Sequence, residues 1–267
     1  MSEEINEEPR PPSDVEKPFM EHLSELVSRM RVVLFSIAVA TLAISILPAN
    51  IDQIITFKTG EYELLVVYLM NVTKEQLLPK GTQLIAMSWV DTIAVYFLIA
   101  ILIGVIITAP ITAYEFYKFV NPALFPHERA FLYPFMASFM TLFIGGVIYA
   151  YYILLPVTYR ILLWFVYGAG ILPLFSVMDF YQFTFLSMVG SGFFFTLPVI
   201  IVLMVKFGMI NADVLKKNRT KVFIGVLVLT AVITPDPTPL SMVLLSAPFI
   251  ILYQISIIAA ERTTPIR

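Results

Sequence analysis

The sequence contains no cysteine, which excludes a disulfide framework and any metal site built on thiolate ligands. Charged side chains are also scarce, because Asp, Glu, Lys and Arg make up 13 % of the chain, whereas soluble domains carry about 25 %. The formal net charge of −2 gives no sign of a nucleic-acid partner. The chain is instead rich in apolar residues: 59 % are hydrophobic and the mean hydropathy is +0.86, so most of the chain is expected to lie away from water.

Six apolar stretches contain no Asp, Glu, Lys, Arg or His: residues 32–47, 92–113, 131–155, 180–205, 222–233 and 240–260. A bilayer core about 30 Å thick is crossed by roughly 20 helical residues, and backbone groups in lipid must be hydrogen-bonded within the segment. The sequence therefore predicts an all-α integral membrane protein with six transmembrane helices. The fifth stretch would span only about 18 Å at the helical rise, which predicts a short fifth helix.

Proline and serine within these stretches indicate how the helices pack. Pro110, Pro198 and Pro248 are expected to kink or end their helices, which would give a curved scaffold. Ser187 and Ser191 in the fourth stretch are expected to let neighbouring helices approach closely.

Two of the predicted outside loops carry signals of their own, and the first of them is long. Residues 48–91 form the first, in which residues 62–68 are expected to lie along the membrane interface. The second is predicted to begin after Pro156 and to hold Trp164, because aromatic side chains are enriched at membrane–water interfaces.

Basic residues are distributed unevenly between the two sides of this arrangement. With six spans both termini lie on one side, and that side carries thirteen Lys and Arg residues against four on the other. Cytoplasmic loops carry the excess of Lys and Arg, so both termini are predicted to be cytoplasmic.

The two ends of the chain differ in composition from its middle. Residues 1–18 are acidic, carry four prolines and lack the basic segment and short apolar core of a signal peptide. We interpret them as a disordered acidic cytoplasmic tail, and a docking role for this tail stays open. Residues 19–260 are predicted to form the six-helix domain, and residues 261–267 a short cytoplasmic tail.

The stretch FMEHLSELVSRM at residues 19–30 directly precedes the first apolar run. Its apolar residues recur at helical spacing, which predicts an amphipathic helix leading into the first span. Glu25 and Arg29 are four residues apart with the acid first, which favours an ion pair. This pair is either an ordinary solvated pair or part of a binding site. An acid is unusual in a segment beside the cytoplasmic surface of a membrane, because the anionic lipids there attract basic segments.

A second acid, Glu128, is predicted at the same level, in a loop at residues 120–129 that is rich in proline and aromatic residues. Two carboxylates beside lipid would suit a cationic peptide. Arginine fits best, because its planar fork meets a carboxylate through two hydrogen bonds. A hydrophobic segment that follows the arginines could then lie against the apolar helix faces.

Four motifs resemble those of TatC, the large subunit of the twin-arginine protein translocase. They are HLSELVSR at residues 22–29, FVNPALFPHER at 119–129, FTLP at 195–198 and TPD at 234–236. The resemblance covers about residues 18–260, with the same order of motifs and the same six-span topology. The motif at 119–129 is the most specific of the four.

This resemblance implies a function. TatC binds twin-arginine signal peptides on the cytoplasmic side of a prokaryotic inner membrane and recruits small single-span partners of the TatA and TatB type. Folded proteins are then exported with the proton-motive force. The resemblance also implies a homo-oligomeric receptor complex, no cofactor and no enzymatic activity. Glu25 and Glu128 match the acids that contact the twin-arginine motif, and Arg29, Phe119 and Pro122 match positions that support them.

Several positions depart from the family pattern or carry a less specific signal. Val27 stands where the family often has a basic residue, and Thr196 where it often has Glu or Gln. The Thr196 hydroxyl could bond a carbonyl of its own helix or a partner helix. Asp236 matches an acid of the last outside loop, shifted by one proline. Gln254 in the sixth stretch suggests an interhelical hydrogen bond or a contact with a partner.

Two other classes of function fit the sequence less well. An intramembrane enzyme is disfavoured because the sequence has only two histidines and neither GxSxG nor HExxH. A small-molecule secondary transporter would place ionisable groups near the middle of the membrane, and the six stretches contain none.

Overall fold

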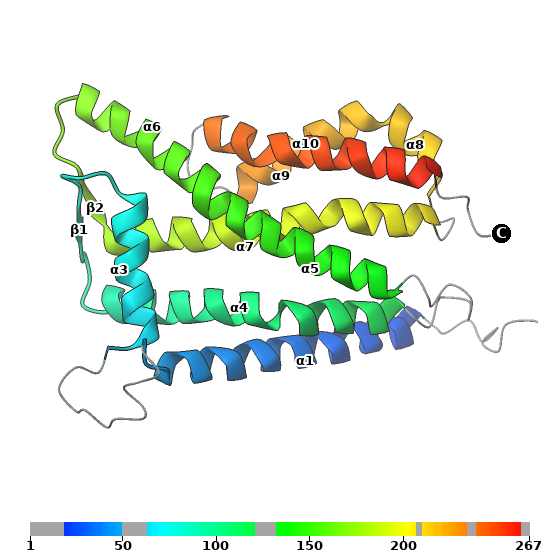
Figure 1. Ribbon diagram of the computed structural model, residues 1–267, viewed down its shortest axis with the longest axis horizontal. Coiled ribbons are helices and arrows are strands. Elements are labelled where there is room, and N and C mark those ends of the chain that lie inside the picture. Colours follow the sequence, from blue (N-terminus) through cyan, green and yellow to red (C-terminus); the bar gives the residue numbers. More distant parts are fainter. Residues whose placement is uncertain (1–18, 50–62, 121–131, 207–209, 234–238, 263–267) are drawn as a thin grey trace, which may run out of the picture.

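The computed structural model describes residues 19–49, 63–120, 132–206, 210–233 and 239–262. Within these ranges the chain is mostly helical, and long helices such as α1, α4 and α7 lie alongside one another, whereas α3 runs across them (Figure 1). The predicted all-α class is therefore confirmed.

The elements follow one another in this order: α1 (Phe19–Ile46), α3 (Leu65–Leu77), β1 (Gln83–Ile85), α4 (Asp91–Val120), α5 (Leu132–Tyr149), η3 (Ala150–Leu154), α6 (Leu155–Gly168), β2 (Leu174–Ser176), α7 (Val177–Lys206), α8 (Ala212–Lys217), α9 (Arg219–Ile233) and α10 (Pro239–Arg262).

Four helical segments in the described ranges are long and apolar enough to cross a membrane: Leu23–Ile46, Asp91–Phe119, Pro134–Gly168 and Val177–Val205. They overlap the first four predicted stretches over most of their length. The fifth stretch lies in α9, whose 15 residues span about 22 Å, and the sixth lies in α10. The short fifth helix is thus present, while six membrane crossings and their orientation stay predictions.

Helices α1 and α4 lie antiparallel and side by side along most of their length (Figure 1). The close approach depends on Gly104, because a Cβ atom at that position would lie 2.8 Å from Oγ1 of Thr41. One turn further along α1, the Tyr96 hydroxyl donates a hydrogen bond to the carbonyl of Ser45. The two helices are therefore closely packed where α1 ends and α4 begins.

The third apolar run continues beyond Pro156, where the sequence suggested an outside loop. A single turn of π-helix precedes the proline, and the Leu155 amide donates to the carbonyl of Ala150, five residues earlier. Proline clashes with the carbonyl four residues before it in a regular α-helix, so the wider turn makes room for the ring. The prediction of a loop directly after Pro156 was wrong, since α6 reaches Gly168 and carries the exposed Trp164.

Helix α7 packs tightly against α5. A Cβ atom at Gly146 would lie 2.5 Å from the carbonyl oxygen of Ser191, and both Ser187 and Ser191 are fully buried. This confirms the prediction of close helix packing at Ser191, whereas for Ser187 only its burial is shown. Pro110, Pro198 and Pro248 lie inside α4, α7 and α10, and none of them ends its helix.

One end of the molecule is covered by elements that run across the long helices. Helix α3 crosses the end of the α1–α4 pair, and β1 pairs in parallel with β2 (Figure 1). The Tyr181 hydroxyl on α7 donates to the carbonyl of Met70 on α3 at 2.7 Å. The sequence did not predict these two short strands. At the opposite end lie the start of α1, the end of α4, the start of α5 and the end of α10.

Candidate functional site

The candidate site lies where α1 begins and α4 ends. Helix α1 starts at Phe19, before the apolar run, so its first turns carry polar residues. The Ser24 hydroxyl donates to the carbonyl of Glu21 at 2.8 Å. Leu23 and Met30, on the predicted apolar face, are 42 % and 52 % exposed, which fits side chains that contact lipid.

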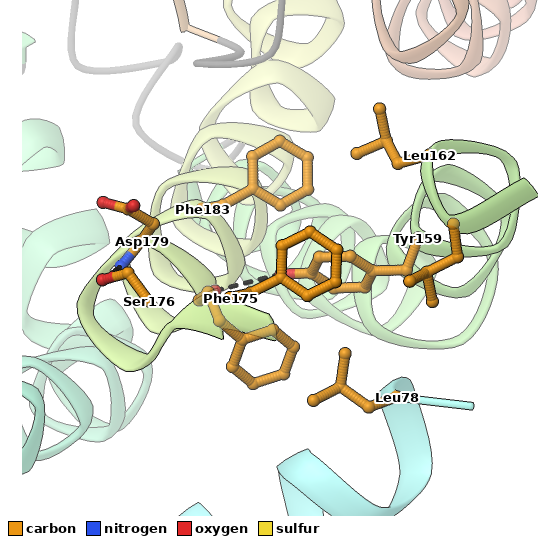
Figure 2. Close-up of a pocket in the computed structure, with 9 residues that line it drawn as sticks. Leu78, Tyr159, Leu162, Phe175, Ser176, Asp179 and Phe183 are labelled. Carbon is orange, nitrogen blue, oxygen red and sulfur yellow. Dashed lines mark hydrogen bonds between the residues drawn. The ribbon is translucent and has the colours of Figure 1, made fainter. Parts of the chain in front are cut away.

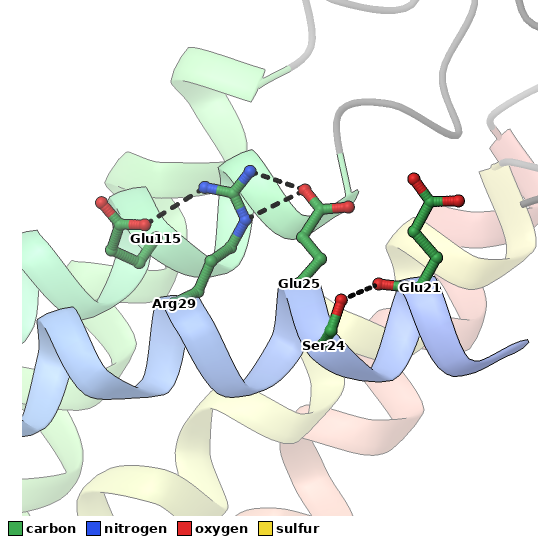
Figure 3. A network of polar contacts seen from close by, with 5 residues as sticks. All are labelled: Glu21, Ser24, Glu25, Arg29 and Glu115. Carbon is green, nitrogen blue, oxygen red and sulfur yellow. Dashed lines mark hydrogen bonds and ion pairs between the residues drawn. The ribbon is translucent and has the colours of Figure 1, made fainter.

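The guanidinium group of Arg29 is held between two carboxylates (Figure 3). Its Nη2 and Nε donate to Oε1 of Glu25 at 2.7 and 3.3 Å, and its Nη1 donates to Oε2 of Glu115 at 3.2 Å. The predicted ion pair between Glu25 and Arg29 is therefore present. The side chains of Arg29, Glu25 and Glu115 are 23 %, 20 % and 10 % exposed, so water screens these charges only in part.

Glu115 was missed by the sequence reasoning. The second apolar stretch ends at Ala113, but α4 continues as a helix to Val120 and brings Glu115 opposite Arg29. A signal was present, because Glu115 is the only acid in residues 92–127 and directly follows an apolar run. Its partner could not be read from spacing, since the two residues are 86 positions apart.

A polar pocket of about 420 Å³ opens beside these three charged side chains and is also lined by Ser24, Ser28 and Lys118. The Lys118 ammonium group lies 4.6 Å from the centre of the Tyr114 ring, in a cation–π contact. The pocket therefore combines two carboxylates with one guanidinium and one neighbouring ammonium group.

An apolar groove of about 190 Å³ continues from the same place along the α1–α4 pair. Its apolar walls are Leu26, Met30, Val33 and Leu34 from α1 and Phe116 and Phe119 from α4. Arg29 and Glu115 line both the groove and the polar pocket. A ligand with a cationic group followed by apolar side chains would find matching surfaces in that order.

Aromatic stacking fixes the end of α4 that carries this site. The Phe116 ring stacks on Phe135 and Phe139 of α5, with ring centres 6.0 and 6.3 Å apart. Phe119 is half-buried and lies in the groove wall. The packing of Phe116 against α5 thus fixes the turn of α4 that carries Glu115.

Three predicted site residues, Pro122, Glu128 and Asp236, lie outside the described residues. A common site for Glu25 and Glu128 therefore stays a prediction. Thr196 is 2 % exposed and its hydroxyl donates to the carbonyl of Phe193 at 2.7 Å, which confirms the interpretation that it bonds within its own helix.

Gln254 is exposed on the surface of α10 and makes no hydrogen bond to other described residues. The interpretation of an interhelical hydrogen bond within this part of the chain was therefore wrong. The physical reason is that Gln254 is exposed rather than packed between helices. Contact with a partner stays a prediction.

A second pocket lies at the opposite end of the molecule, between α6, α7 and β2 (Figure 2). Its volume is about 190 Å³, and Asp179 is the only charged side chain in its lining. The Tyr159 hydroxyl donates to the carbonyl of Phe180 at 3.0 Å and lies 2.9 Å from the hydroxyl of Thr184. These polar groups are satisfied by one another, so they serve the packing of α6 on α7.

Comparison with known proteins gives a consistent result. A family model described as Sec-independent protein translocase protein (TatC) matches residues 21–248. Sec-independent protein translocase protein TatC of Aquifex aeolicus is 29 % identical over 254 residues, which cover 92 % of this chain and 96 % of the relative. The protein of the same name from Carboxydothermus hydrogenoformans is 28 % identical over 223 residues, or 83 % of this chain and 88 % of the relative.

A solved structure is similar as well. The crystal structure of the twin-arginine translocase receptor TatC superimposes with a TM-score of 0.74 at 25 % identity, and the match covers 91 % of this chain and 99 % of that one.

Proposed function

Because the chain belongs to the Sec-independent protein translocase (TatC) family, we propose that it is the receptor subunit that binds twin-arginine signal peptides on the cytoplasmic side of a prokaryotic inner membrane. The solved relative is itself described as a twin-arginine translocase receptor. One observation carries the proposal: two carboxylates from different helices hold a guanidinium group at the mouth of an apolar groove. A signal peptide presents arginines followed by apolar residues, which match these two surfaces.

The chemistry of the site favours arginine over lysine. A guanidinium group offers a planar fork of donors, so it can bond both a carboxylate of α1 and one of α4, as Arg29 does. Hydrogen bonds to charged groups contribute about 1.5–3 kcal/mol each, and partial exclusion of water strengthens them. A lysine keeps the charge, but its three donors share one nitrogen and cannot form a planar fork.

Glu128, Phe119 and Pro122 are proposed to complete the peptide site. Phe119 lies in the groove wall. Helix α4 ends at Val120 and α5 begins at Leu132, both at the end of the molecule that carries Glu115. The two helix ends that flank Pro122 and Glu128 in the sequence thus lie on the side of the molecule that carries the site, which supports this proposal.

The remaining parts of the function follow from the family. We propose that the protein recruits single-span partners of the TatA and TatB type and assembles with further copies of itself. The complex then exports folded proteins with the proton-motive force. The exposed Gln254 on α10 is a candidate contact for a partner helix, and Thr196 and Asp236 are weaker candidates. The protein is proposed to act without a cofactor and without enzymatic chemistry of its own.

Cross-linking to a signal peptide tests this proposal. Glu25→Ala and Glu128→Ala are each expected to weaken cross-linking to a twin-arginine signal peptide, because each removes a carboxylate that pairs with arginine. Ser187→Ala is the control, since Ser187 is fully buried between helices and away from the site. Equal cross-linking of all three variants, at equal amounts in the membrane, contradicts the proposed site.

A further inference from the structure

Building on the proposed function, we propose that Glu115 is a third carboxylate of the signal-peptide site, and that Arg29 occupies the position that a peptide arginine takes. Binding is then an exchange in which one guanidinium group replaces another. Arg29 is the resident group, and its side chain moves aside when the peptide enters.

The first support is the geometry of Arg29. Its fork reaches Glu25 on its own helix and Glu115 on α4, so it already makes the contacts with two helices that the proposed ligand needs (Figure 3). Glu115 is only 10 % exposed and is held in place by the stacked aromatic side chains of α4 and α5. A fixed, partly buried carboxylate is suited to recognise a guanidinium group rather than any cation.

The second support is the position of this pair. Arg29 and Glu115 are the residues at which the polar pocket and the apolar groove meet. A guanidinium group in place of that of Arg29 would leave the next residues of its peptide at the mouth of the groove. The observed pair therefore coincides with the boundary between the charged and apolar parts of the proposed ligand.

The third support is energetic. Removing the partner of a buried charge is costly, because the remaining charge is left unpaired. An exchange of one guanidinium for another avoids that cost at Glu115 and Glu25. Arg29 is 23 % exposed and borders the polar pocket, so its flexible side chain has a path toward water.

An alternative is that the contact only ties α1 to α4. The two explanations predict different changes of peptide affinity. If the contact is a tie, Glu115→Gln and Arg29→Gln break the same bond and change peptide binding in the same direction. If Arg29 is a resident competitor, loss of Glu115 weakens peptide binding and loss of Arg29 strengthens it.

The experiment is a titration of the full-length protein in lipid nanodiscs with a fluorescent twin-arginine signal peptide. We expect Glu115→Gln to weaken binding about tenfold, which corresponds to one charge-assisted hydrogen bond. Arg29→Gln is expected to tighten binding several-fold. Arg29→Lys is expected to tighten it less, because lysine keeps the charge and loses only the fork.

Arg31→Gln is the matched control. Arg31 is exposed on α1 two residues further on, so this variant removes the same charge at nearly the same depth. Tightening by Arg29→Gln that exceeds the effect of Arg31→Gln supports the exchange. Equal changes of peptide affinity in the two variants would overturn the exchange and indicate an effect of long-range charge alone. Weaker peptide binding by Arg29→Gln would overturn it and indicate that the contact only connects α1 to α4.

The folded state of each variant is checked by its thermal unfolding midpoint, and Arg29→Lys keeps the test usable if Arg29→Gln unfolds. Failure of the exchange is separable from failure of the proposed function. If Glu25→Gln abolishes peptide binding while both Arg29 variants weaken it, the receptor site stands and the exchange is wrong. If Glu25→Gln and Glu128→Gln leave binding unchanged, the peptide site itself is wrong, and the exchange falls with it.

Discussion

At the scale of single residues, the same polar group has different roles according to its partner. The buried hydroxyl of Thr196 donates to a carbonyl of its own helix, whereas the buried hydroxyl of Tyr159 connects α6 to α7. Loss of the Thr196 bond leaves helix packing unchanged, because the carbonyl of Phe193 keeps its backbone partner in the helix. The second contributes to the packing of two helices.

We therefore expect Thr196→Val to change the unfolding free energy by less than about 0.5 kcal/mol, and Tyr159→Phe to lower it by about 1 kcal/mol. The measurement is chemical or thermal unfolding of the purified variants in one detergent. Export of a folded reporter should be unaffected by Thr196→Val. A larger loss of stability or export in Thr196→Val than in Tyr159→Phe contradicts the assigned roles.

At the scale of elements, the contact between α5 and α7 depends on which of two adjacent glycines faces the partner helix. A Cβ atom at Gly146 would lie 2.5 Å from a backbone oxygen of α7, whereas at Gly145 there is no atom within 4 Å among those described. The two positions therefore form a matched pair on one helix.

Gly146→Ala is expected to lower stability by about 1–3 kcal/mol, because α5 and α7 must separate to admit the methyl group. Gly145→Ala should be neutral or stabilising, by up to about 1 kcal/mol, since alanine favours the helix. Thermal unfolding midpoints in detergent compare the two. Similar midpoints would show that α5 and α7 do not approach each other this closely.

The elements also show what the sequence can and cannot predict. Long apolar runs predict helices because lipid leaves no other way to satisfy the backbone, and the bond between Glu25 and Arg29 follows from local spacing. The bond between Arg29 and Glu115 depends on how α1 packs against α4, which no local pattern encodes. Pro156 was misread because a π turn before it accommodates the ring.

At the scale of the whole molecule, the starts and ends of the helices decide which residues share a membrane face. The start of α1 and the end of α10 lie at the same end of the molecule (Figure 1), and the excess of basic residues predicts that this end is cytoplasmic. The candidate site would then meet signal peptides before export.

The absence of cysteine makes this orientation directly testable. Ser2→Cys and Thr264→Cys should react with a membrane-impermeant maleimide only after cells are opened. Lys80→Cys lies at the end of the molecule covered by α3. It should react while the cytoplasmic membrane is intact, provided that the reagent can reach the outer face of that membrane. Labelling of Ser2→Cys, but not of Lys80→Cys, while the membrane is intact would show that the orientation is opposite to the prediction. The site would then not lie on the cytoplasmic face.

The measurement that tests the central claim most directly compares two forms of one signal peptide, with Arg-Arg and with Lys-Lys, for binding to the full-length protein in nanodiscs. The carboxylate site predicts that the Arg-Arg form binds at least about tenfold more tightly, because lysine retains the charge but loses the paired hydrogen bonds. Glu25→Gln should reduce this preference. Equal affinity of the two peptides for the unaltered protein would contradict recognition of the guanidinium group at this site.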